Sequence, residues 1–235
     1  MVQALQRTAV RGPTFIRLLA RLTDRDVPAS RQSLPDRLSH WLDWTHAIAL
    51  STALDGRPSV DDAGGPAFSS EEEAECARLR ASLVLAITGD PVLAIGADGA
   101  GSDNAGDDYA VFRQRCLTLQ RRMQAATGHL RGRLRDMLAR QSSELAGLAS
   151  VDAVMELALS PREHMLLAAV PALLGEHFER LRQSAPSEAA EGEAASATPA
   201  PWLDGFRKDV QSVLLAELDV RFQPVEGLLA ALRTR

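Results

Sequence analysis

The chain has 235 residues, of which 46% are hydrophobic and 24% charged but only 4% aromatic, so Leu and Ala must supply most of the core. Because these residues favour helices and strand-forming residues are scarce, the composition predicts an all-α protein with enough chain for a real core. The net charge of -5 disfavours a surface built as a whole to attract nucleic acid or anionic lipid, and two cysteines do not suggest a disulfide framework.

No segment suits export or a membrane span. The apolar stretch at residues 15–22 is interrupted by Arg17 and Arg21, whereas a secretory signal needs an uncharged core. The longest uncharged apolar run, residues 165–174, contains a proline and is far shorter than the roughly 20 residues that cross a bilayer. We therefore expect a cytoplasmic protein without direct membrane insertion.

Three stretches read as linkers between helical blocks. Residues 55–68, 96–107 and 184–201 are rich in Gly, Pro, Ala, Ser or acidic residues and poor in large apolar ones. The last stretch has no large apolar residue, so we expect it to be disordered. The division predicts an N-terminal helical segment at 1–54, a central bundle at 69–183, and C-terminal helices at 202–235 that pack on the bundle.

The first block carries two helix starts. Thr14 is expected to cap a short helix, and Ser33, with Asp36 three residues later, is expected to cap a second. The apolar stripe of the second predicts a single helix that extends to residue 48, through Leu34, Leu38, Trp41, Thr45 and Ile48.

The central block begins with a serine at 69 or 70 and a glutamate three residues on, which is the pattern of a capping box. The helix that it opens should end near Gly89. A long helix is predicted over about 107–140, although Gly128 and Gly132 weaken its middle, and another over 143–159.

The clearest predicted start is Ser160, with Pro161 at the first helical position and Glu163 at the third. Pro171 lies inside the helix that follows and should kink or split it. After the last linker one helix is expected near Trp202, and Pro224 is expected to begin a short final one. The result is an irregular bundle of about eight helices.

No catalytic, metal or cofactor site can be read from these patterns. The Gly/Asp-rich loop 96–108 lacks the spacing of phosphate-binding and calcium-binding loops, so it reads as a linker. Cys116 lies beside Arg115 but falls on an apolar stripe, so burial is a better reading than reactivity. The histidines do not show the spacing of metal ligands: His40, His46, His129, His164 and His177.

The predicted long helix is basic although the chain is acidic. Between residues 113 and 140 it holds eight arginines against one acid, Asp136, which makes the local net charge +7. Coiled-coil partners place pairing charges beside an apolar seam, so helix packing is the leading interpretation, ahead of an acidic protein partner and of nucleic acid. Four of the arginines form a row along one edge of the apolar stripe: Arg115, Arg122, Arg133 and Arg140.

Three stretches carry a resemblance to a known family. They are RGPTFIRLLARLTD from Arg11, continuing through DVPASRQSLPDRLSHWLDWTHAIALSTAL, then SPREHMLLAAVPALL from Ser160, and LLAELDVRFQPVEGLLAAL from Leu214. They resemble a family of uncharacterised proteobacterial proteins, domain of unknown function 3348, across the chain apart from the linkers. The resemblance transfers no catalytic residue. It implies an arrangement similar to ion-driven stators, since members are often encoded beside a large membrane protein and an OmpA-like, peptidoglycan-binding protein.

We therefore expect a non-enzymatic helical adaptor or scaffold that binds a protein partner, or itself, through helix faces. Its expected place is the cytosolic side of an envelope-associated stator-like or OmpA-like complex. The candidate partner-binding residues are the four arginines of the row, and no cofactor is expected. The alternative is a nucleic-acid-binding regulator that uses the helix from Arg113 to Arg140. A third class, a hydrolase or transferase, would need a polar site assembled from distant helices.

Overall fold

The computed structural model describes residues 14–24, 32–56, 69–96, 108–185 and 201–234, which form α-helices and no strand. The all-α prediction is confirmed for this part of the chain. The predicted linkers at 55–68, 96–107 and 184–201, including the expected disorder of the last, lie outside it except for their edges. The helices are α1 (Thr14–Thr23), α2 (Leu34–Trp41), α3 (Trp44–Asp55), α4 (Ser70–Thr88), α5 (Tyr109–Gln141), α6 (Ser143–Ala168), α7 (Val170–Ser184) and α8 (Pro201–Arg233).

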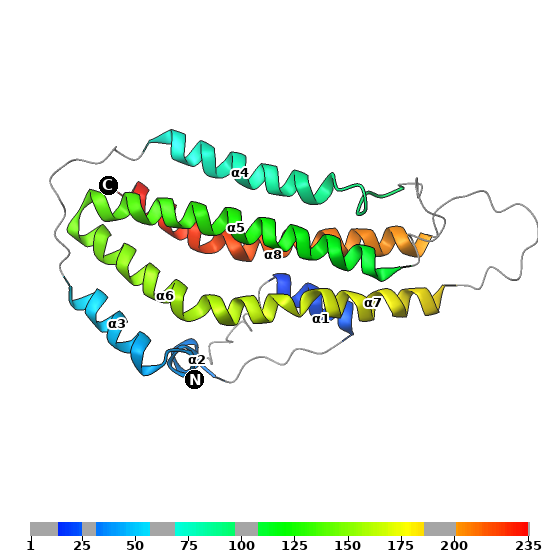
Figure 1. Cartoon of the computed structure of the whole chain (residues 1–235), viewed down its shortest axis with the longest axis horizontal. Helices are drawn as coiled ribbons and strands as arrows, with labels where there is room; N and C mark the ends of the chain where they lie inside the picture. The colour runs from blue at the N-terminus through cyan, green and yellow to red at the C-terminus, as the bar shows by residue number, and fades with distance from the viewer. Residues whose placement is uncertain (1–13, 25–31, 57–68, 97–107, 186–200, 235) are drawn as a thin grey trace, which may run out of the picture.

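Two long helices, α5 and α8, lie side by side at the centre of the molecule (Figure 1). They run in the same direction, since Phe112 meets Phe206 near their beginnings and Gln120 meets Glu217 further on. Helix α4 covers one side of the pair, and α6 and α7 follow each other along the other side. Helix α1 packs on α7 and α8, whereas α3 lies on the outer face of α6.

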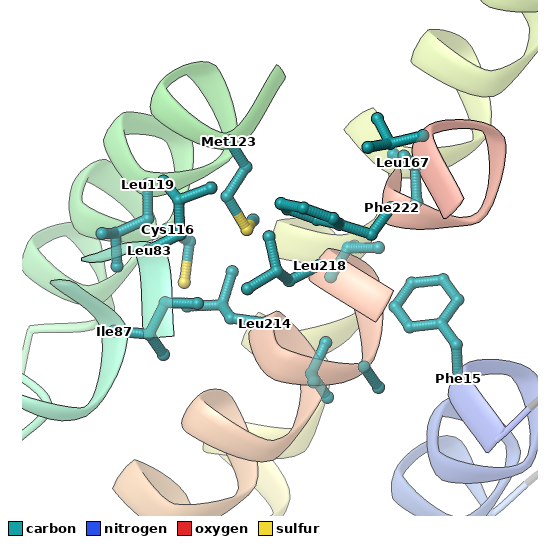
Figure 2. Close-up of a cluster of buried hydrophobic side chains, with 14 of the residues drawn as sticks. Phe15, Leu83, Ile87, Cys116, Leu119, Met123, Leu167, Leu214, Leu218 and Phe222 are labelled. Carbon is teal, nitrogen blue, oxygen red and sulfur yellow. The ribbon is translucent and has the colours of Figure 1, made fainter. Parts of the chain in front are cut away.

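The core forms where α4, α5 and α8 meet, as Figure 2 shows. Met123 of α5 and Leu218 of α8 are buried there, and Ile87 closes the cluster from α4. Phe15 reaches α8 from α1. Large aliphatic side chains dominate this core, as a composition rich in Leu and poor in aromatics requires.

Helix α5 agrees closely with its prediction. It begins at Tyr109, where the Asp108 carboxylate accepts a hydrogen bond of 2.8 Å from the Ala110 amide, and it ends at Gln141. Cys116 is buried on its apolar stripe, as expected, and burial raises the pKa of the thiol to about 12. The seam predicted from the periodicity is therefore the face that packs on the core.

Two predicted helix starts are wrong, because two prolines lie inside continuous helices. Pro161 lies within α6 and Pro224 within α8, so the expected pair of C-terminal helices is one helix of 33 residues. Each proline deprives the carbonyl four residues earlier, at Leu157 and Val220, of its amide donor. The local start signals are overridden because both helices pack along α5 over their length.

The second helix is also shorter than predicted. The stripe from residue 34 to 48 is divided between α2 and α3, since the carboxylate of Asp43 accepts a hydrogen bond of 2.8 Å from the His46 amide and starts a new helix. The capping box of Ser33 and Asp36 is confirmed. The predicted break near Pro171 is confirmed as well, because α6 ends at Ala168 and α7 begins at Val170.

Candidate functional site

The row of arginines predicted to bind a partner lies along α4 of its own chain. Arg115 donates to the carboxylate of Asp90, whose side chain has no exposed surface. Arg133 donates from Nη1 and Nη2 to the carboxylate of Glu75 on α4, and Nη2 lies 2.8 Å from Oε2. This hydrogen bond is the main cause that lowers the pKa of the Glu75 carboxyl.

The other two arginines of the row make weaker contacts. The Nη2 atom of Arg122 lies 3.4 Å from the hydroxyl of Ser82 on α4, and Nε of Arg140 donates to the Asp136 carbonyl of its own helix at 3.0 Å. The row therefore meets two acids within the fold, Glu75 on α4 and Asp90 just after the end of α4. Contact of these arginines with another protein stays a prediction.

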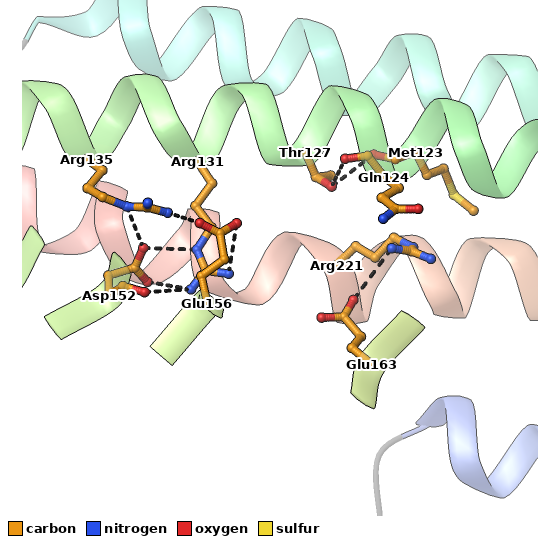
Figure 3. A network of polar contacts seen from close by, with 9 residues as sticks. All are labelled: Met123, Gln124, Thr127, Arg131, Arg135, Asp152, Glu156, Glu163 and Arg221. Atoms are coloured by element: carbon orange, nitrogen blue, oxygen red, sulfur yellow. Dashed lines mark hydrogen bonds and ion pairs between the residues drawn. The ribbon is translucent and has the colours of Figure 1, made fainter. Parts of the chain in front are cut away.

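The opposite side of α5 carries a second ionic contact, shown in Figure 3. Arg131 donates two hydrogen bonds, of 2.7 and 3.0 Å, to the carboxylate of Asp152 on α6, and Nε of Arg135 donates to the same carboxylate at 3.1 Å. Arg135 also binds Glu156. This contact was not predicted, although the sequence holds a signal for it: the two arginines on α5 and the two acids on α6 are each spaced four residues apart.

A buried carboxylate lies between α5 and α8. Glu217 has no exposed surface, and it accepts hydrogen bonds from Nε2 of Gln120 at 2.8 Å and from Nε and Nη2 of Arg221 at 2.9 and 2.8 Å. Gln120 also donates to the Leu167 carbonyl at 3.1 Å, which ties α6 to the pair. Burial raises the pKa of the Glu217 carboxyl, although these hydrogen bonds oppose the rise.

This buried group was also missed in the sequence, although its signal is visible there. Val210, Leu214 and Glu217 share one buried helical stripe of α8, and Arg221 continues it. A charged residue on a buried stripe requires partners from neighbouring helices. Arg221 lies one turn later on α8 itself, so the sequence can suggest it, whereas only the fold identifies Gln120 of α5 as a partner.

Beside Glu217 a pocket of about 230 Å³ opens between α5, α6 and α8. Arg131 and Gly128 line it from α5, Glu163 lines it from α6, and Arg221 and Pro224 line it from α8. Figure 3 shows Arg221 and Glu163 pointing toward each other across it. The pocket thus joins residues that lie almost 100 positions apart in the chain.

The chemistry of the pocket is polar and balanced in charge. Its cationic side chains are guanidiniums that carboxylates already hold, and its one imidazole, His164, is exposed. Over the described ranges, no three His, Cys, Asp or Glu side chains are grouped so that they could hold a metal ion. The arrangement therefore suits hydrogen bonding to a small polar molecule better than metal chemistry.

A different feature marks the outer side of the molecule. Helix α3 has no buried residue, and its Trp44 and Ile48 are 80% and 50% exposed. An open groove of about 470 Å³ between α3 and α6 is lined by apolar side chains that include Leu54 and Leu148. Large apolar side chains gathered on one helix of a folded protein mark an interaction surface.

The described helices include none that is long and apolar enough to cross a bilayer. Among protein families, one model matches residues 1–234, and its description reads "Protein of unknown function (DUF3348)". No curated protein and no solved structure matches the chain. A function must therefore be argued from the geometry.

Proposed function

Since the chain belongs to this family of proteins of unknown function, we propose from its geometry that it is a helical adaptor whose α3 binds a protein partner. The observation that carries the proposal is the exposure of Trp44, at 80%, on a helix without any buried residue. Tryptophan is enriched among the residues that dominate binding energy at protein interfaces.

Helix α3 has two faces of different environment. His46, Ala49, Leu50 and Ala53 lie on the side toward α6 and are half-buried. Trp44 and Ile48 lie on the opposite side and are exposed. Trp44 and Ile48 thus place large apolar side chains on an outward side that Ser51 and Asp55 continue with polar ones, and packing on α6 does not use them.

The occupant that this surface fits is an amphipathic helix of a partner protein. Trp44 and Ile48 are one helical turn apart, which is the spacing at which a facing helix places its own apolar side chains. That the partner belongs to an envelope-associated, stator-like or OmpA-like complex stays a prediction from the resemblance.

The test uses a photo-reactive amino acid at position 44 in native cells, with mass spectrometry of the cross-linked protein, followed by a Kd measured with both purified proteins. We expect Trp44→Ser to weaken that binding about 30-fold or more, because a dominant interface residue contributes about 2 kcal/mol or more. Leu85→Ser is the matched control, since Leu85 is 70% exposed on α4. It should change the Kd less than twofold.

Two results would contradict the proposal. If Trp44→Ser and Leu85→Ser bind the partner equally well, α3 is not the interface. If sedimentation shows a dimer of the unmodified protein that Trp44→Ser dissolves, the surface serves self-association instead.

The alternative from the sequence, a nucleic-acid-binding regulator, is tested with Arg121, an exposed arginine of α5 that pairs with no carboxylate among the described residues. Micromolar binding of duplex DNA in physiological salt, weakened by Arg121→Glu and falling with salt at a log-log slope of about -0.9 per phosphate contact, would favour the alternative. Arg115 and Arg133 are unsuitable for this test because their substitution breaks ion pairs within the fold.

A further inference from the structure

The pocket between α5, α6 and α8 is separate from α3, and two buried guanidiniums face it. The side chains of Arg131 and Arg221 are 14% and 7% exposed. Each is held firmly on one side, Arg131 by Asp152 at 2.7 Å and Arg221 by Glu217 at 2.8 Å. Both arginines are therefore fixed in place before any ligand arrives.

The remaining nitrogen of each guanidinium makes only a long contact. Nη1 of Arg131 lies 3.6 Å from Oε1 of Glu156, and Nη1 of Arg221 lies 3.5 Å from Oε1 of Glu163. A charge-assisted hydrogen bond between such groups measures about 2.7–2.9 Å. Each nitrogen thus retains donor capacity that a carboxylate in the pocket can use.

Hydrogen-bond acceptors also border the pocket. Pro224 has no amide hydrogen, so the carbonyl of Val220, four residues earlier in α8, lacks its helical donor. On the facing wall, formed by α6, the carboxylate of Glu163 is 41% exposed, and its contact with Arg221 is long. A ligand ammonium group would find both acceptors near the arginines.

The space in the pocket depends on a glycine that the helix itself does not need. Gly128 lies in the middle of α5, where glycine costs about 1 kcal/mol relative to alanine, and a Cβ there would meet nothing within 4 Å. Gly132, one turn later, is equally unhindered but does not line the pocket. The chain thus provides a matched pair of positions, one inside the pocket and one outside.

The charges select the class of ligand. The lining carries two guanidiniums and two glutamates. A simple anion is attracted by the guanidiniums and repelled by the glutamates, whereas a simple cation is attracted by the glutamates and repelled by the guanidiniums. A molecule that carries both signs satisfies both pairs. The volume, about 230 Å³, limits it to a small molecule.

We propose that this pocket binds a small zwitterion of amino-acid size, with its carboxylate on Arg131 and Arg221 and its ammonium group at Glu163 and the Val220 carbonyl. The binding site lies on the far side of α6 from α3. It is therefore independent of the adaptor function.

The experiment measures the Tm of the full chain, and then the Kd by calorimetry, with four zwitterions: glycine, L-serine, L-glutamine and γ-aminobutyrate. Acetate and inorganic phosphate are the anionic controls, and methylamine is the cationic one. At 100 times its Kd a bound zwitterion should raise the Tm by about 5–10 °C. The simple ions should not raise it.

Three variants separate the pocket from general effects. Gly128→Leu fills it and should abolish the Tm rise, whereas Gly132→Leu should keep it. Glu163→Gln removes the anchor of the ammonium group and should weaken zwitterion binding at least tenfold while allowing acetate to bind. This third variant keeps the test decisive if Gly128→Leu fails to fold.

The proposal is overturned if none of the four zwitterions raises the Tm at 10 mM (about the upper end of weak specific binding). Equal loss of binding in the Gly128 and Gly132 variants would overturn it too. So would phosphate or acetate binding more tightly than every zwitterion to the unmodified protein.

Discussion

At the scale of single residues, the buried carboxylate of Glu217 is a group whose protonation depends on folding. Removing a charge from water is costly, and only Gln120 and Arg221 offset the cost by direct hydrogen bonds. Burial outweighs these bonds, so the pKa of Glu217 is raised above its ordinary value of 4.5. The folded protein therefore holds this proton more tightly than the unfolded chain does.

The consequence is a pH-dependent term in the free energy of unfolding. Because the folded pKa is raised, the contribution of Glu217 is fully present below pH 4.5 and is lost as the pH rises through the folded value. Glu217→Gln abolishes this term. We therefore expect the free energy of unfolding of the variant, minus that of the unmodified protein, to increase from pH 4.5 upward and then to level off.

Urea unfolding followed by circular dichroism at several pH values between 4.5 and 7.5 measures this difference. Glu179→Gln is the control, because the side chain of Glu179 is 44% exposed and pairs with Arg182 on the surface. Its difference from the unmodified protein should stay flat over the same range. A flat difference for Glu217→Gln as well would show that the folded and unfolded states hold the proton equally.

At the scale of elements, the two prolines inside α6 and α8 show that packing between helices can outweigh the local preference of proline to end a helix. Proline is about 3 kcal/mol less favourable than alanine inside a helix, because it removes one hydrogen bond and crowds the preceding turn. Both helices nevertheless continue. Helix α6 contacts α5 on both sides of Pro161, and α8 contacts α5 through Glu217 before Pro224 and α4 through Glu226 after it. The break that proline normally imposes is seen at Pro171, which lies at the beginning of α7.

We predict that Pro161→Ala stabilises the protein by about 1–3 kcal/mol, since the new amide restores a hydrogen bond to the Leu157 carbonyl while the unfolded chain gains some freedom. Pro35→Ala is the comparison, because Pro35 lies in the first turn of α2, where no helical hydrogen bond is lost. It should change the stability by less than about 1 kcal/mol. Denaturant unfolding of both variants measures this, and a loss of stability in Pro161→Ala would instead support a helix start at residue 160.

At the scale of the whole molecule, the helices differ in how strongly they are held. Helix α8 contacts α1, α4, α5 and α7 and is buried along most of its length, whereas α3 lies on α6 and contributes no buried residue. Regions with few buried apolar contacts open locally at a lower free energy than the core. The proposed partner surface therefore lies on α3, a helix that contributes no buried residue to the core of the described fold.

Hydrogen exchange followed by mass spectrometry should resolve this difference. We expect amides of residues 46–55 in α3 to exchange at least tenfold faster than those of residues 210–218 in α8, because α3 can open without disrupting α5 and α8. A bound partner should slow exchange in α3 and leave α8 unchanged. Equal protection of the two helices in the free protein would mean that α3 unfolds only with the core.

The class of fold and much of the helix pattern could be predicted from the sequence. The limits of α5, the capping box at Ser69 and the end of α4 at Gly89 follow from side chains within a few residues of each other, so they are visible in one chain. The burial of Cys116 follows from its place on an apolar stripe for the same reason.

Which charges meet and where a pocket opens depend instead on how the helices pack against one another. Arg133 meets Glu75, 58 residues away, and Gln120 meets Glu217, 97 residues away, because α4 and α8 both pack on α5. Neither local periodicity nor capping carries information about such neighbours. The continuity of α6 through Pro161 has the same origin, since contacts with a distant helix outweigh the loss of one hydrogen bond.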